Sequence, residues 1–197
     1  MINKKTALLA TIATIAGAIL IFGPLSDQAS GGGEAVKLEG SWVMVGPTIG
    51  MRNLETFIPN PSGRTAAVYG QAISADATAG GLCPNADYLS SSIGEVVLTG
   101  PSSVEATTVI YSMNKVAPRD QIECIWVANA SAEFTADTQE GIINFSIYPT
   151  WGFPGYPNPD ADGDLLPDPG AEPILCLQVP FEAKRVPMIP PCTPPAP

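Results

Sequence analysis

Eight short runs rich in Val, Ile, Thr and aromatic residues recur along the chain, and they restrict its fold more than any other feature. They cover residues 41–46, 53–58, 65–73, 95–100, 105–113, 121–130, 141–148 and 174–186. Such runs favour strands, and the Gly, Pro and Asn residues between them favour antiparallel turns. The run at 105–113 also alternates with a period of two, which indicates one face toward solvent. The sequence therefore predicts an all-β domain of about eight mostly antiparallel strands, as a barrel or a two-sheet sandwich.

The segment LEGSW, residues 38–42, puts Gly40 and Trp42 at the start of the first predicted strand. This Gly-x-Trp resembles the opening of lipocalin-like barrels. The resemblance covers these five residues, and it implies a barrel in which a basic side chain of the last strand, Lys184 or Arg185, covers Trp42. An ordinary core tryptophan on a first strand accounts for the same residues.

The segment DADGDLLPD, residues 160–168, concentrates aspartates in one loop of a sparsely charged chain. The four are Asp160, Asp162, Asp164 and Asp168. Carboxylates at alternate positions of a tight loop converge, and Gly163 permits the backbone angles that such a loop needs. Calcium accepts six to eight oxygen ligands in irregular geometry. The sequence therefore predicts a calcium site at these aspartates, with a solvated acidic loop as the alternative.

The same nine residues resemble the calcium loop D-x-D-G-D-x-x-P-D of thrombospondin type 3 repeats, which implies calcium bound by the four aspartates. Two departures weaken the match: Leu165 stands where the family usually has glycine, and the chain holds one copy where the family has many. The loop is not an EF-hand, because Pro169 occupies the position of the bidentate glutamate.

Directly before this loop, the segment YPTWGFPGYPNP, residues 148–159, interleaves aromatic residues with Pro and Gly. The four aromatic residues are Tyr148, Trp151, Phe153 and Tyr156. Rigid exposed rings can stack on the apolar faces of sugars, so these residues are candidates for carbohydrate binding. The alternative is that they cap one end of the core beneath a long loop.

Residues 1–30 resemble an export segment with a flexible leader. Lys4 and Lys5 precede an apolar run that ends at Gly23 and Pro24. A membrane anchor that stays uncleaved is the alternative, and this segment is the only membrane contact that we expect. We expect one β domain over 31–186 and a Pro-rich tail over 187–197. The protein would then be secreted, periplasmic or at the cell surface.

Four cysteines in an exported chain predict two disulfides. The cysteines are Cys83, Cys124, Cys176 and Cys192. No Cys-x-x-Cys pair occurs, which argues against a zinc site. The expected pairing is Cys124 with Cys176 between strands, and Cys83 with Cys192 from a loop to the tail.

The chain contains no histidine, which excludes the Ser-His-Asp triad, the Cys-His dyad and every metal site with a histidine ligand. A net charge of −10 argues against a nucleic acid partner. We expect a calcium-stabilised binding or structural module without enzymatic activity, which recognises a carbohydrate or a cell-surface partner.

Two other functions stay open. One is a lipocalin-like carrier of a small apolar ligand. The other is a glycoside hydrolase, whose mechanism needs a pair of carboxyl groups across a cleft. The candidates for such a pair are Glu95, Glu105, Glu123 and Glu133.

Overall fold

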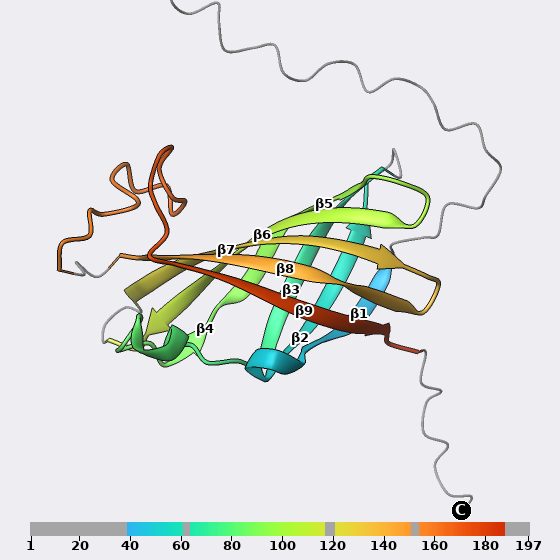
Figure 1. Ribbon diagram of the computed structural model, residues 1–197, viewed down its shortest axis with the longest axis horizontal. Helices are drawn as coiled ribbons and strands as arrows, with labels where there is room; N and C mark the ends of the chain where they lie inside the picture. Colours follow the sequence, from blue (N-terminus) through green and yellow to red (C-terminus); the bar gives the residue numbers. More distant parts are fainter. Residues whose placement is uncertain (1–38, 61–63, 117–120, 151–153, 188–197) are drawn as a thin grey trace, which may run out of the picture. The chain divides into compact units, whose positions relative to one another are not determined.

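The computed structural model describes residues 39–60, 64–116, 121–150 and 154–187 (Figure 1). The predicted export segment lies outside these residues, as do Trp151, Phe153, Cys192 and the tail beyond Pro187. The described part contains no helix that is long and apolar enough to span a membrane.

Nine strands form the described fold, and every predicted run corresponds to one of the eight long strands. The strands are β1 (Gly40–Gly46), β2 (Met51–Pro59), β3 (Thr65–Ser74), β4 (Tyr88–Leu89), β5 (Ser91–Leu98), β6 (Ser103–Asn114), β7 (Gln121–Phe134), β8 (Thr138–Pro149) and β9 (Leu175–Arg185). Two single turns of 3-10 helix, η1 (Pro47–Ile49) and η2 (Ala79–Gly81), lie in the connections. The prediction of an all-β fold is confirmed.

The long strands close into an antiparallel barrel. Following the wall, β1, β2, β3, β5, β6, β7, β8 and β9 each pair with the next, and β9 returns to β1. The short β4 pairs with the end of β6. Neighbours in the wall are therefore neighbours in the chain, as in an up-and-down barrel, and the closure excludes the alternative of a sandwich.

Two glycines lie where neighbouring strands of the wall approach each other closely. A Cβ atom at Gly94 of β5 would lie 1.9 Å from the carbonyl oxygen of Thr107, and one at Gly141 of β8 would lie 2.2 Å from that of Ser131. No side chain fits at such distances. Glycine at these positions therefore allows the neighbouring strands to approach and the sheet to curve into a barrel.

Trp42, near the start of β1, is fully buried, and its ring packs edge to face on Phe57 with 6.4 Å between centroids. The guanidinium of Arg185 lies 4.5 Å from the centre of the Trp42 ring. Arg185 also donates hydrogen bonds to the carbonyl oxygens of Ala136 and Glu39. A basic side chain of the last strand, that of Arg185, thus covers Trp42.

The connection from β3 to β4, which contains η2, is joined to β6 and β7. The buried Ser112 hydroxyl donates to the carbonyl oxygen of Ala77 at 2.7 Å and accepts from the indole N–H of Trp126 at 2.7 Å. A disulfide between Cys83 and Cys124 ties the same connection to β7, with 6.0 Å between the Cα atoms.

This disulfide shows that the predicted pairing was wrong. Cys124 lies on β7 and Cys176 on β9, with β8 between them. Two strand spacings of about 4.8 Å place such residues roughly 10 Å apart, beyond the reach of a disulfide. Cys176 is exposed and has no disulfide partner among the described residues. Cys83 is bonded to Cys124 instead of Cys192, whose position is outside the described ranges.

Candidate functional site

The acidic loop connects β8 to β9 and lies at one end of the barrel (Figure 1). The hydroxyl of Tyr111, on β6, donates to the carbonyl oxygen of Leu165 at 3.1 Å, which fastens the loop to the barrel wall. Burial raises the pKa of Tyr111, and the negative charges of Asp160 and Asp164 raise it further.

Three of the four predicted aspartates converge. One carboxyl oxygen from each of Asp160, Asp162 and Asp164 lies within 4.8 Å of those of the other two. Backbone N–H groups donate to all three carboxylates: that of Leu165 to Asp160 at 3.3 Å, that of Asp164 to Asp162 at 3.1 Å, and that of Leu166 to Asp164 at 2.8 Å. The remaining oxygen of Asp160, Oδ1, is buried and has no hydrogen-bond partner.

Asp168 has a different position. Its carboxylate accepts a hydrogen bond of 2.9 Å from the backbone N–H of Ala161, and its own N–H donates to the carbonyl oxygen of Pro159 at 2.6 Å. These two bonds join the beginning and the end of the loop. Asp168 therefore closes the base of the loop, and the three aspartates that converge are the other ones.

Two residues of the loop have a left-handed backbone conformation. Leu165 has a φ of 70°, and Gly163 has a φ of 79°. Only glycine adopts this left-handed conformation without steric cost, which for other residues is about 1–2 kcal/mol. Leu165 is thus a point of backbone strain.

Of the four aromatic residues predicted for ligand binding, the structure describes Tyr148 and Tyr156, whereas Trp151 and Phe153 lie outside the described residues. Tyr148 on β8 and Tyr156 are both partly buried, and the Tyr156 hydroxyl is buried without a hydrogen-bond partner. Burial raises the pKa of Tyr156, and electrostatic interactions with Tyr148 and Glu172 raise it further. A hydroxyl that points inward fits a cap over the end of the core better than an exposed stacking surface.

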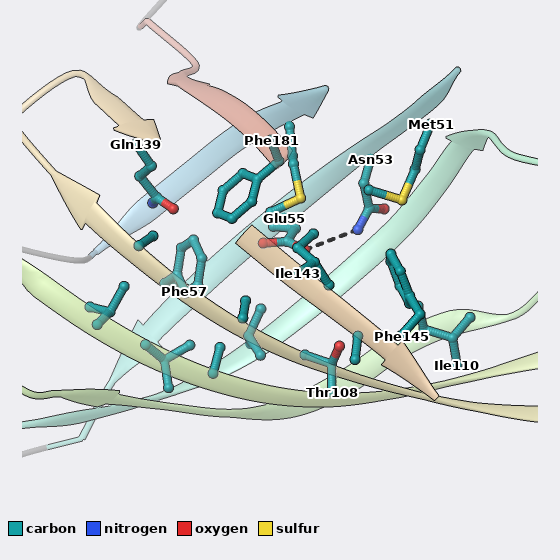
Figure 2. A pocket seen from close by; sticks show the side chains of 18 residues that line it. Met51, Asn53, Glu55, Phe57, Thr108, Ile110, Gln139, Ile143, Phe145 and Phe181 are labelled. Carbon is teal, nitrogen blue, oxygen red and sulfur yellow. Dashed lines mark hydrogen bonds between the residues drawn. The ribbon is translucent and has the colours of Figure 1, made fainter. Parts of the chain in front are cut away.

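The barrel interior contains a cavity (Figure 2). Eighteen side chains line it, and most of them are aliphatic or aromatic. The space that the centre of a water molecule can occupy in this cavity measures about 40 Å³. One buried water needs about 10–15 Å³ by this measure, so the cavity has room for roughly three waters or a few non-hydrogen atoms of a ligand.

A polar cluster of Asn53, Glu55 and Ser92 lies inside the barrel. The amide nitrogen of Asn53 donates to the carboxyl group of Glu55 at 3.0 Å (Figure 2). Burial raises the pKa of Glu55 to about 7, although the hydrogen bond from Asn53 acts in the opposite direction. A Cβ atom at Gly70 would lie 2.0 Å from the Ser92 hydroxyl and 3.0 Å from the Asn53 amide nitrogen, so glycine there provides the room for the cluster.

Several interior polar atoms have no partner. The amide oxygen of Asn53 and the hydroxyl of Ser92 are buried without a hydrogen bond, and so is the amide nitrogen of Gln139 on β8. Asn53 is 8% exposed and Gln139 is 3% exposed. An unpaired buried polar group costs about 1–3 kcal/mol. The interior therefore contains polar groups whose hydrogen-bonding capacity is not satisfied by other groups of the protein.

The sequence analysis did not select Glu55 or Asn53. A signal was present, because Met51, Asn53, Glu55 and Phe57 alternate and share one face of β2. The opposite face carries Leu54 and Ile58, which are as apolar as Met51 and Phe57. Both faces were therefore plausible core faces, and an acid on the inner one was not identified.

The glutamates proposed for catalysis do not gather in the cavity. Glu95, Glu105 and Glu133 are exposed on the outer wall. Glu123 is buried near the start of β7, where the amide nitrogens of Asn114 and Asn85 donate to it at 3.2 Å and 3.4 Å.

A row of carboxylates crosses the outer wall. Glu133, Glu140 and Glu182 are successive cross-strand partners on β7, β8 and β9, and all three are exposed. The Ser102 and Ser103 hydroxyls donate to Glu133 at 3.0 Å and 2.7 Å. Like charges directly opposite on neighbouring strands destabilise a sheet.

Comparisons with family models, with characterised proteins and with solved structures found no match to this chain.

Proposed function

We propose that this protein is an exported β-barrel module in which calcium bound by the acidic loop stabilises the fold. The observation that carries the proposal is the convergence of Asp160, Asp162 and Asp164 within 4.8 Å. Oxygens on opposite sides of a calcium ion lie roughly 4.6–5.2 Å apart, since each Ca–O distance is about 2.3–2.6 Å. Small movements of these side chains would give three ligands, and carbonyl oxygens and waters would supply the others.

The surroundings support a structural role for the ion. The loop is fastened to β6 through Tyr111, so an ion that orders the loop also strengthens its contact with the barrel. The unpartnered Oδ1 of Asp160 would gain a ligand bond. Asp168 holds the loop closed instead of binding the ion directly, because its carboxylate already accepts a hydrogen bond from the backbone N–H of Ala161.

Secretion, or a periplasmic or cell-surface location, belongs to the same proposal. The Cys83–Cys124 disulfide supports it, because structural disulfides persist in oxidising compartments. A carbohydrate or cell-surface partner remains our expectation, although the buried hydroxyl of Tyr156 favours a capping role for that residue.

The alternatives receive less support. Ligand pockets usually measure about 300–1,000 Å³, whereas the interior cavity measures about 40 Å³, so it does not favour a carrier of a bulky apolar ligand. Among the residues that line this cavity, Glu55 is the only acid. A glycosidase mechanism needs two carboxyl groups.

Thermal unfolding in chelator, calcium and magnesium tests the calcium site. Extracellular calcium modules have dissociation constants near 10⁻⁴ to 10⁻³ M, so about 10 mM calcium should add roughly 1.4–2.7 kcal/mol of stability. This corresponds to a rise in Tm of about 3–10 °C. Magnesium should do less, because it requires octahedral geometry and keeps its waters.

The variant Asp162→Asn with Asp164→Asn should lose the calcium response. Glu95→Gln with Glu105→Gln is the matched control, since it also removes two exposed charges, and it should keep the full response. An equal shift in both double variants, or no shift in the wild type, would show that the loop is not a calcium site.

A further inference from the structure

The polar cluster of Asn53, Glu55 and Ser92 is independent of the acidic loop and of its proposed function. Glu55 is the only titratable side chain among the eighteen that line the interior cavity. The side-chain hydrogen bond that bears on its charge comes from a neutral amide, that of Asn53. An ionised carboxylate in such surroundings needs a positive partner or more donors.

The free hydrogen-bonding capacity of the cluster is mostly that of acceptors. Glu55 in its ionised form accepts only, and the amide oxygen of Asn53 is a buried acceptor with no donor. The Ser92 hydroxyl can accept as well as donate. A group that carries several N–H donors and, opposite the carboxylate, a positive charge would complement these acceptors.

We propose that the barrel interior binds a small organic cation, a primary ammonium group on a short apolar chain, with the ammonium against Glu55 and Asn53. An ammonium group has three donors and no acceptor, which matches the free acceptors of the cluster. The chain would lie against the apolar part of the lining, where Met51, Phe57 and Phe145 face the same cavity (Figure 2).

The cavity volume limits the size of this ligand. At about 40 Å³ it admits about three or four non-hydrogen atoms. The best small ligands gain a limited free energy per atom, so a ligand of this size should bind with a dissociation constant on the order of 10⁻⁴ M. The two methionines of the lining, Met44 and Met51, have flexible side chains that can adjust to slightly longer chains.

Binding should depend on the protonation of Glu55. Burial raises its pKa to about 7, so it is largely ionised at pH 8.5 and largely neutral at pH 5.5. An alkylammonium keeps its charge throughout this range, as a lysine does. The affinity should therefore fall about thirtyfold from pH 8.5 to pH 5.5.

Titration calorimetry with n-propylammonium chloride and the full-length protein tests the proposal. At pH 8.5 the wild type should bind, Glu55→Gln should bind at least tenfold more weakly, and the matched control Glu95→Gln on the outer wall should bind as the wild type does. Propan-1-ol, a neutral molecule of the same size, should also bind at least tenfold more weakly. Asp162→Asn with Asp164→Asn should retain binding, which separates this site from the calcium site.

An NMR titration of the Glu55 carboxyl carbon gives a second readout that needs no variant. Saturating n-propylammonium should lower the pKa of Glu55 by about one unit or more, because the cation favours the ionised form. Absence of binding to the wild type at 10 mM amine, equal binding by Glu55→Gln, or equal binding of propan-1-ol would overturn the proposal. Any of these results would mean that water alone serves the interior polar groups.

Discussion

The acidic loop and the barrel interior both contain carboxyl groups, but the two regions differ in the number of hydrogen-bond donors that surround these groups. In the loop, backbone N–H groups donate to each of the Asp160, Asp162 and Asp164 carboxylates. In the interior, Glu55 has one amide donor and apolar surroundings, and its pKa rises to about 7. The loop is thus suited to concentrated negative charge, whereas the interior favours a neutral acid unless a cation joins it.

Removal of the Cys83–Cys124 disulfide should have the largest effect, because it should change both the free energy of unfolding and the pKa of Glu55. In the chain-entropy account, a bridge closing a loop of 41 residues contributes about 4 kcal/mol. Replacing both cysteines with serine should lower the free energy of unfolding by this order. It should also loosen the β3–β4 connection, so that water reaches the barrel interior and the pKa of Glu55 moves toward its ordinary value.

The calcium response of the acidic loop should survive that double replacement, since the loop is held through Tyr111 on β6. Urea unfolding and NMR titration of Glu55 measure the two effects. A loss of stability below about 1 kcal/mol, or an unchanged Glu55 pKa, would show that the bridge does not keep the interior dry.

The next largest effect concerns Glu55 alone. Its pKa in the folded protein is about 7 against an ordinary value of 4.5, so the folded state binds the proton more tightly than the unfolded chain does. The corresponding stability is fully present below about pH 4.5 and is lost as the pH rises through about 7. The loss amounts to roughly 3 kcal/mol.

Glu55→Gln should therefore be more stable than the wild type at pH 8.5, by up to about 3 kcal/mol, and similar to it at pH 4. Urea unfolding at several pH values checks this, with Glu95→Gln as the control. If Glu55→Gln retains the same pH dependence as the wild type, the carboxyl group is better solvated than its position in the barrel implies.

Backbone strain in the acidic loop should give a smaller effect. Leu165→Gly should relieve the strain of a φ of 70°, and part of that gain is offset by the entropy of glycine in the unfolded chain. We expect a net gain of about 0.5–1 kcal/mol. Gly163→Ala is the matched opposite, because it introduces a side chain at a φ of 79°. The idea fails if thermal unfolding shifts the two variants in the same direction.

The smallest effect should come from the row of exposed carboxylates on the outer wall. Glu140 lies between Glu133 and Glu182, so Glu140→Gln should add about 0.5 kcal/mol by relieving repulsion. The gain should shrink in 1 M salt, where exposed charges are screened. A gain that salt does not change would have to come from something other than charge.

Sequence patterns predicted the wall of this barrel well because each strand follows from a local signal. Runs of β-branched and aromatic residues between turn residues identified all eight long strands. The two-residue β4 carries no such run, and it forms because the end of β6 extends beyond β5 and offers a free edge.

The contents of the barrel were harder to predict, because they depend on which face of a strand points inward. On β2, Leu54 is 38% exposed and Ile58 is 53% exposed, while the polar Asn53 is buried. Local hydrophobicity gives no reason for this orientation. The closed ring of neighbours imposes it, through Met51 and Phe57 on the inner face. The disulfide pairing escaped prediction for a similar reason, since it depends on a loop that crosses the end of the barrel.

The acidic loop lies between these extremes. The spacing of its aspartates indicated convergence, and three of them do converge. The separate position of Asp168 depends on backbone hydrogen bonds with Ala161 and Pro159, which only the folded loop defines.

The pairing of β1 with β9 has a consequence for the order in which the molecule can be made. Only four residue pairs join these strands, against twelve between β6 and β7, and the contact of Arg185 with Glu39 spans 146 residues. Until β9 has been synthesised, β1 and β8 are unpaired edges that can recruit other chains. Folding of the barrel should therefore be slow and completed only when nearly the whole chain has been delivered. A chain that stops short of Arg185 would remain an open, aggregation-prone sheet.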